Sequence, residues 1–310
     1  FGTFDVVAGG DVTQSGALSV VGATLLSAAS KNVVLDSPLN DFQSAVSTST
    51  QTAVNSILLV NKNNFRVGGV NATDSITLTV DPTFVQSSTK EITLNGNLTS
   101  LVGTVTFNAQ VKSNSLGNTI KGESILFNED VVGFGRVTLD AVDSIKIDGD
   151  FRSDVGALLI VKNTKNFTVN NIIKSDFDVA ETEKVSVNSI QNLGLSNQGN
   201  NVGGNGFDVK IIASEIVLGG VNTSGADGGG IGGQSSTGGN AGSVEIVGSK
   251  SVTLNGDIKT QGGIGSIFSS IPGVPNTPTQ GASRVAQIKV GTITSRSEEH
   301  TSELQSRLQI

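Results

Sequence analysis

Three copies of one nine-residue pattern constrain the fold more than any other feature of this chain. The copies are Ile92–Ser100 (ITLNGNLTS), Ile145–Ser153 (IKIDGDFRS) and Val252–Thr260 (VTLNGDIKT). In each copy apolar residues alternate with polar ones, an Asn-Gly or Asp-Gly pair follows, and an apolar residue opens the next run. Alternation of this kind is typical of a strand, and an Asn-Gly or Asp-Gly pair is typical of a tight turn. A recurring strand–turn–strand unit indicates a repeat protein.

The interval between repeats is also regular. Gly135, Gly156 and Phe177 each open a strand-like segment 21 residues after the previous one. Similar segments return at 207–224 and 243–260. The apolar pairs that this spacing aligns are Ile145 and Ile147, Phe167 and Val169, and Val185 and Val187.

Strands with two or three residues to a side cannot form stable free-standing hairpins. Stacked coils remove this difficulty, because each coil pairs with the coils above and below and extends one core. We therefore predict an all-β fold for residues 1–295, a parallel β-helix whose coils are about 21 residues long. At about 4.8 Å per coil this gives roughly 14 coils and a rod of roughly 65 Å. An antiparallel β-sandwich fits the strand content but not the regular coil length.

The turn of each nine-residue copy is expected to form a corner between sheets. At these corners glycine would supply positive φ at little steric cost. The expected corner glycines are Gly96, Gly149 and Gly256, each preceded by an equivalent polar residue, Asn95, Asp148 and Asn255.

Two segments interrupt the strand pattern. Residues 225–242 (GADGGGIGGQSSTGGNAG) are expected to form a surface loop that is too glycine-rich to pack. Residues 271–281 (IPGVPNTPTQG) hold three of the five prolines and are expected to form a second extended loop.

The end of the chain has a different character. Arg296–Ser306 (RSEEHTSELQS) resembles the in-frame translation of a sequencing-library adapter, so residues 296–310 are treated as a non-native tail. A genuine amphipathic helical tail is the alternative. The only histidine, His300, lies in this stretch, so residues 1–295 contain no His, Cys, Met, Trp or Tyr.

Composition excludes several classes of function. Without the tail, 18 Lys and Arg stand against 24 Asp and Glu, because the tail holds two of the 20 basic and three of the 27 acidic residues. An acidic chain without basic clusters is a poor ligand for nucleic acid or an anionic membrane. Zero Cys excludes a disulfide framework, and no apolar run is long enough for a membrane helix. The start of the chain, Phe1–Asp5, suggests an internal piece of a longer protein.

The opening segment, Gly9–Ser47, contains GALSVVGATLLSAASKNVVLDSPLNDF and resembles the repeat region of filamentous-haemagglutinin-like exoproteins. The resemblance implies a right-handed parallel β-helix that is secreted or displayed outside the bacterial outer membrane. It also implies an outer-membrane transporter as partner during export, and a host or neighbouring-cell receptor or glycan bound through other parts of the parent protein. The secretion motifs NPNL and NPNG of that family do not occur in the chain, so this piece would belong to the shaft.

Candidate chemistry is limited to carboxylates. Residues 1–295 offer no histidine base, no thiol and no His or Cys zinc ligand. Five acids crowd two successive strands and could in principle cleave a glycosidic bond or bind calcium. They are Asp140, Asp143, Asp148, Asp150 and Asp154. The preferred interpretation is that alternation sends these acids outward as a solvated face.

Two further features are also interpreted structurally. Gly225–Gly233 only partly matches the calcium-binding nonapeptide repeat, because it occurs once and Asp227 precedes most of the glycines. Phenylalanines that alternate with polar neighbours are expected to stack in the core; examples are Phe107, Phe127, Phe151 and Phe167.

The sequence therefore predicts a non-enzymatic shaft segment of a large bacterial adhesin, with no catalytic, cofactor-binding or metal-binding residues and no cofactor. Two alternatives stay open: an autotransporter passenger, and a β-helical polysaccharide lyase or hydrolase that uses the carboxylate cluster.

Overall fold

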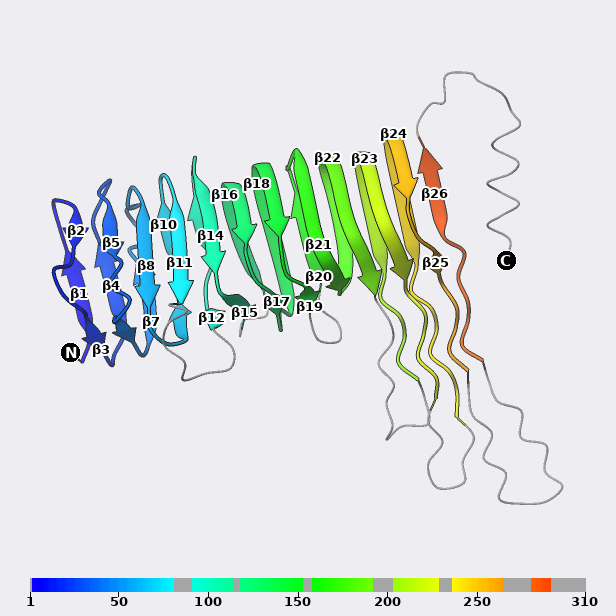
Figure 1. The fold of residues 1–310 in the computed structure, drawn as a ribbon, viewed down its shortest axis with the longest axis horizontal. Coiled ribbons are helices and arrows are strands. Elements are labelled where there is room, and N and C mark those ends of the chain that lie inside the picture. The colour runs from blue at the N-terminus through cyan, green and yellow to red at the C-terminus, as the bar shows by residue number, and fades with distance from the viewer. Residues whose placement is uncertain are drawn as a thin grey trace, which may run out of the picture.

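The structure is a computed structural model that describes residues 2–80, 91–113, 117–152, 158–191, 203–228, 236–264 and 280–290. These residues form an all-β fold without a helix (Figure 1). The strands are β1 (Phe4–Val7), β2 (Val12–Thr13), β3 (Ser19–Val20), β4 (Thr24–Ser27), β5 (Val33–Leu35), β6 (Asp41–Phe42), β7 (Ala45–Thr48), β8 (Ile57–Asn61), β9 (Phe65–Val67), β10 (Val70–Ala72), β11 (Ile76–Val80), β12 (Glu91–Leu94), β13 (Leu98–Ser100), β14 (Thr104–Asn108), β15 (Gln110–Ser113), β16 (Asn118–Phe127), β17 (Val131–Val132), β18 (Arg136–Ile147), β19 (Phe151–Arg152), β20 (Leu158–Lys162), β21 (Asn166–Lys174), β22 (Asp176–Gln191), β23 (Val209–Asn222), β24 (Val244–Leu254), β25 (Ile258–Lys259) and β26 (Gln287–Val290). Within the described ranges no helix is long and apolar enough to cross a membrane.

Strand pairing joins segments that lie far apart in the chain. All paired strands in the described residues run parallel, and all but β3 and β6 belong to one 24-stranded sheet. Successive strands follow one another along the long axis of the molecule (Figure 1). Parallel pairing throughout excludes the antiparallel β-sandwich for this part of the chain.

One column of paired residues runs through the described structure. It passes through Val12, Val33, Ile57, Ile76, Val105, Ile125, Ile145, Phe167, Val185, Ile216 and Val252. Most neighbours in the column are 18 to 24 residues apart in sequence, but Ile76 and Val105 are 29 apart, Val185 and Ile216 are 31 apart, and Ile216 and Val252 are 36 apart. Ten steps of about 4.8 Å make a column of about 48 Å. The column covers residues 12–252, for which a constant interval of 21 residues would give about eleven steps, or about 53 Å. The longer intervals thus make this part of the stack slightly shorter than expected, and the ladder continues beyond it to β26.

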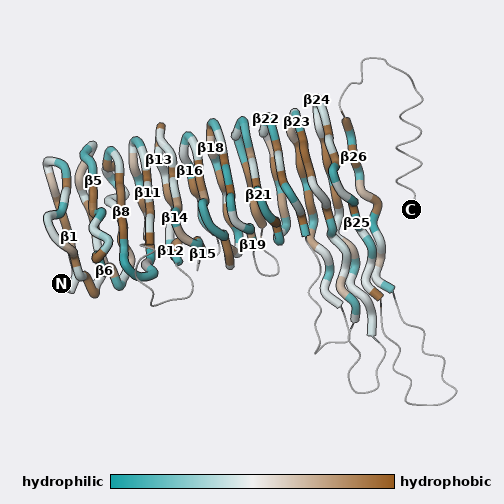
Figure 2. The backbone as a smooth tube through the Cα atoms, viewed as in Figure 1, coloured by the Kyte–Doolittle hydropathy of each residue, from teal (hydrophilic) through white to brown (hydrophobic). Residues whose placement is uncertain are grey.

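The core is a single cluster of aliphatic and phenylalanine side chains that extends along the stack. Strands alternate buried and outward positions, so brown and teal segments alternate along the tube (Figure 2). Ile145 pairs with Phe167 and Phe167 with Val185, which confirms the alignment predicted from the sequence. Inward residues of neighbouring coils thus lie in register and exclude water from one continuous interior.

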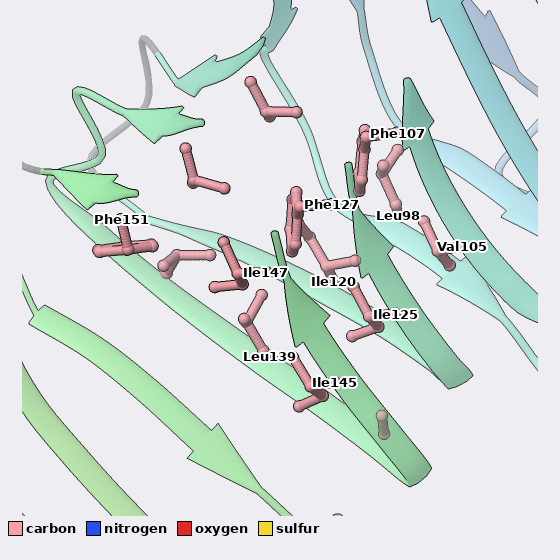
Figure 3. Packing of buried hydrophobic residues seen from close by; sticks show 14 of the residues in the cluster. Leu98, Val105, Phe107, Ile120, Ile125, Phe127, Leu139, Ile145, Ile147 and Phe151 are labelled. Atoms are coloured by element: carbon pink, nitrogen blue, oxygen red, sulfur yellow. The ribbon is translucent and has the colours of Figure 1, made fainter. Parts of the chain in front are cut away.

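Phenylalanines form the largest elements of this core. Phe107, Phe127, Phe151 and Phe167 are all at most 1% exposed, which confirms the prediction that they are core residues. Phe107 and Phe127 stack with ring centroids 4.7 Å apart, and Figure 3 shows them beside Leu98 and Ile120. Phe167 packs on Phe177 at 5.6 Å.

The corner glycines do not have the conformation expected from the sequence. Gly96, Gly149 and Gly256 are not in the positive-φ region; among the described glycines that conformation is found at Gly133 (φ +67°). Close packing against the backbone of the preceding coil explains why glycine is needed at these corners. A Cβ on Gly149 would lie 2.5 Å from the amide nitrogen of Asp130, and one on Gly96 would lie 2.6 Å from that of Gly69. Glycine is required because the preceding coil leaves no room for a side chain.

The preceding polar residues occupy equivalent positions, as predicted. In each case the backbone N–H donates to a carbonyl oxygen of the previous coil: Asn95 to Val67, the last residue of β9, Asp148 to Phe127, the last residue of β16, and Asn255 to Leu218 within β23.

The glycine-rich region packs against its neighbours, contrary to the prediction that it is too glycine-rich to do so. In the described parts of 225–242, Gly228, Gly238, Gly239 and Gly242 are buried. The segment 236–243 runs beside 203–206 in the same direction, since Gly203 and Gly206 donate to Thr237 and Asn240, both at 2.8 Å.

Segment 236–243 also forms hydrogen bonds with segment 223–226 of the same polypeptide, which runs in the opposite direction. Gly239 donates to Ala226 and Gly242 donates to Thr223, both at 2.8 Å. A Cβ on Gly239 would collide with the carbonyl of Gly204. Because the glycines lack Cβ atoms, these extended segments can approach one another closely. Every third residue then donates a backbone hydrogen bond to a neighbouring segment. The segments lie together beyond the ends of β23 and β24 (Figure 1). We call the described segments 203–206, 223–228, 236–243, 259–264 and 280–284 the glycine bundle.

Apart from Gln280 and Gly281, the proline-rich segment 271–281 lies outside the described residues, as do residues 229–235 and the whole tail 296–310.

Candidate functional site

The predicted carboxylate cluster lies on and after β18, and its members face different basic partners. Asp140 lies 3.8 Å from Lys121 Nζ, Asp143 lies 3.5 Å from Lys165 Nζ, and Asp148 lies 2.8 Å from Lys146 Nζ. Asp154 is outside the described residues. These pairs place cations among the acids, so the described cluster is not a bare acidic surface.

Asp150 differs most from the expected solvated face, because it is only 7% exposed. Its carboxylate accepts hydrogen bonds from Arg152 Nε at 2.8 Å and from the backbone N–H of Ile172 at 3.1 Å. The Arg152 guanidinium also lies 3.9 Å from Asp130. The hydrogen bond to Asp150 raises the pKa of the Arg152 guanidinium, and the negative charges of Asp150 and Asp130 raise it further, although partial burial acts in the opposite direction. This carboxylate is engaged in holding two coils together.

A catalytic pair would need a different arrangement. Glycoside hydrolysis requires two carboxyl groups that flank a bound sugar, one of them able to donate a proton. Here Asp150 binds backbone and guanidinium, and Asp148 binds Lys146 and accepts a 2.6 Å hydrogen bond from Asn170 Nδ2. The local geometry therefore favours a structural role for these acids.

A second polar region, not identified from the sequence, forms a groove of about 310 Å³ across β20, β22, β23 and β24. Its charged members face outward on three successive coils: Asp178 pairs with Lys210, and Lys210 pairs with Glu245. The lining residues are Leu158, Asp176, Phe177, Asp178, Asp208, Val209, Lys210, Ser243 and Glu245.

The sequence signal for this groove is misleading. The triplet Phe-Asp-Val occurs at 177–179 and at 207–209, and aligning the triplets would place Phe177 beside Phe207. The structure instead pairs Phe177 with Val209, two residues further on. Asp176 then lies opposite Asp208, which no motif in the sequence indicates.

Two carboxylates in the groove influence each other. Burial raises the pKa of Asp176, and the negative charge of Asp208 raises it further, although the backbone N–H of Asp208 lowers it by donating at 2.7 Å. Asp208 in turn accepts 2.7 Å hydrogen bonds from the backbone N–H and the hydroxyl of Ser243. These carboxylate oxygens of Asp176 and Asp208 are thus engaged in hydrogen bonds within the protein.

An apolar groove of about 360 Å³ lies where the ladder is irregular. It is lined by Thr182, Glu183, Ile212, Ala213, Ser214, Val247 and Ser249. The register shifts between Val179 and Thr182 and again between Ala213 and Glu215, which opens the corner of these coils.

Across the described ranges no three or more His, Cys, Asp or Glu side chains come together as a metal site. The prediction that the chain has no catalytic, cofactor or metal residues remains a prediction.

Comparison with known proteins identifies a repeat sequence at the start of the chain. A family model described as "Repeats of unknown function (DUF5649)" matches residues 1–49. These residues include the segment Gly9–Ser47 that resembles filamentous-haemagglutinin repeats, and in the structure they form the first parallel strands, β1 to β7. No curated protein and no solved structure matches the chain.

Proposed function

We propose that this chain is a structural, non-enzymatic shaft segment of a large bacterial adhesin of the filamentous-haemagglutinin type, secreted or displayed on the cell surface. The observation that carries the proposal is the parallel ladder, which stacks strands from Phe4 to Val290 on one continuous core. Such a ladder gives an elongated, stiff body, because each coil is fixed by two neighbours.

The detailed architecture that we propose is a right-handed parallel β-helix with a basic coil of about 21 residues. Connections between parallel strands of one sheet are right-handed in about 98% of cases, which supports the hand. The separations of 20 residues between Ile125 and Ile145 and of 22 between Ile145 and Phe167 support the coil length. The longer separations nearer the C-terminus then represent insertions into the basic coil.

Partners follow from the same proposal. An outer-membrane transporter would pass the unfolded chain, and an absence of cysteine suits such passage because no disulfide has to be broken or re-formed. A receptor or glycan on another cell would bind elsewhere in the parent protein. An autotransporter passenger has the same kind of shaft and differs in carrying its translocating barrel on the same chain.

The experiment that tests the non-enzymatic role is incubation of the purified chain with a panel of acidic and neutral polysaccharides, with release of reducing ends as the readout. We expect no release. Release by the parent chain that is lost in both Asp148→Asn and Asp150→Asn would contradict the proposal and establish the polysaccharide-degrading alternative. Small-angle X-ray scattering of the same sample tests the elongated shape.

A further inference from the structure

Side-chain oxygens of Asp and Asn bridge neighbouring coils, and most of them accept a backbone N–H of the following coil. Asp130 Oδ1 accepts the backbone N–H of Asp150 at 2.8 Å, and Asp150 Oδ1 accepts that of Ile172 at 3.1 Å. Each acceptor lies at a paired position in the preceding coil, since Val131 pairs with Phe151 and Phe151 with Ile173.

The same arrangement recurs outside this corner. Asn97 Oδ1 accepts the N–H of Thr119 at 2.8 Å, and in the glycine bundle Asn205 accepts from Asn240 and Asn240 from Ala282, both at 2.8 Å. A strand-forming part of the chain and a glycine-rich part therefore use one device.

Direction distinguishes these bonds from ordinary ladder bonds. Among the described residues, ten backbone N–H groups donate to an Asp or Asn of the preceding coil. Two donate to the following coil, Leu18 to Asn40 and Phe42 to Asn61. Backbone ladder bonds connect a coil equally to both neighbours, whereas most of these side chains accept a hydrogen bond from the coil that follows them in the sequence.

The consequence of losing an acceptor is unequal for its two neighbours. If Asp208 loses its carboxylate, the N–H of Ser243 in the next coil loses its acceptor, while the bond from Asp208 N–H back to Asp176 stays. A backbone donor without an acceptor destabilises the segment that carries it. The order of a coil is therefore sensitive to the coil before it.

We propose that these Asp and Asn side chains couple the coils directionally, so that each coil is held in place by acceptors of the coil that precedes it in the chain. This property belongs to the fold and does not depend on the proposed adhesin role. It implies that a coil, once formed, presents a row of oriented acceptors on which the next coil orders.

The test is amide hydrogen exchange, measured by mass spectrometry on the full chain with Asn97→Ala and Asp208→Ala. We expect exchange to become about fivefold to tenfold faster in the following coil, β16 for Asn97→Ala and β24 for Asp208→Ala. In the preceding coil, β10 or β22, it should stay within about twofold of the parent rate. Asn97→Asp and Asp208→Asn keep an acceptor oxygen and should behave like the parent.

Asn97 lies toward the N-terminal end of the stack and Asp208 toward the C-terminal end. Directional coupling predicts faster exchange in the following coil for both variants, whereas fraying predicts faster exchange on the side of the nearer end of the stack. Faster exchange in β10 than in β16 for Asn97→Ala would show fraying and overturn the proposal. Equal acceleration on both sides, or none, would overturn it as well.

Asp178→Ala is the charge-matched control and should leave exchange in β24 unchanged. If an alanine variant does not fold, Asn64→Ala replaces it, because Asn64 Oδ1 accepts the N–H of Glu91 in the following coil, and β12 is then compared with β7.

Discussion

Phe107 and Phe127 lie ring over ring at paired positions of β14 and β16, with centroids 4.7 Å apart and planes inclined by 4°. This distance equals the usual spacing of paired strands, about 4.7–4.9 Å. The aromatic stack therefore repeats the geometry of the backbone ladder, and the core tolerates no relative shift of these coils.

Removing one ring of this stack should destabilise the protein strongly. Phe127→Ala leaves a cavity beside Phe107 and Ile120, and we expect a loss of about 3–5 kcal/mol in the free energy of unfolding. Chemical denaturation monitored by far-ultraviolet circular dichroism measures it. Thr106→Ala, an outward position on β14, is the control and should change stability by less than about 1 kcal/mol. Equal effects of the two changes would contradict the described core.

Adding one methyl group at a corner should also be destabilising. In Gly149→Ala the new Cβ would meet the backbone of Asp130 at 2.5 Å, and relieving this contact should cost about 1–3 kcal/mol. Gly16→Ala is the matched control, because its Cβ would have nothing within 4 Å, and it should be nearly neutral. The same denaturation assay distinguishes them, and a neutral Gly149→Ala would show that the coils are not packed this closely.

The groove carboxylate Asp176 should make stability depend on pH. Burial and then the charge of Asp208 raise its folded-state pKa above the ordinary 3.8. The folded protein thus holds this proton more tightly than the unfolded chain, so stability from this group is full below pH 3.8 and decreases as pH rises through the folded-state value.

Asp176→Asn keeps an oxygen for the N–H of Asp208 but removes the charge. We expect the variant to be at least as stable as the parent at pH 7 and to lose this part of the pH dependence, as measured by urea unfolding at several pH values. A variant less stable than the parent at pH 7 would argue against the assigned burial.

Asp41 should show the opposite dependence. Burial alone would raise its pKa, but hydrogen bonds from Gln43, Asn63 and Lys62, together with the charge of Lys62 at 3.3 Å, hold it below 3.8. Its contribution is present above pH 3.8 and is lost as pH falls through the folded-state value. Asp41→Asn should therefore lower the unfolding midpoint in urea at pH 7, and the difference from the parent should become smaller as the pH falls below 3.8. A loss that stays the same at every pH would point to packing instead of charge.

Much of the ladder could be predicted from the sequence. Period-two alternation identifies inward residues such as Ile145, Phe167 and Val185, and their spacing was enough to align the coils. The inward phenylalanines followed from the same alternation. These features are local, and the stack repeats them.

Other features depend on contacts between coils, which one sequence does not display. Gly149 looked like a residue needed for its φ angle, but it is needed because Asp130 lies against it in the previous coil. Gly239 looked unable to pack, yet it packs because Gly204 and Ala226 also lie in glycine-rich segments. The pairing of Asp176 with Asp208 was hidden because the repeated Phe-Asp-Val triplet is displaced by two residues.

The most direct test of the proposed shaft role is a long sequencing read through the genomic locus. We predict an open reading frame with more repeats of this kind, an upstream secretion domain and a neighbouring gene for an outer-membrane transporter, and we predict that the residues 296–306 are absent from it. A downstream barrel in the same frame would indicate an autotransporter passenger. A short reading frame that ends soon after Ser295 would contradict the shaft and favour a self-contained enzyme.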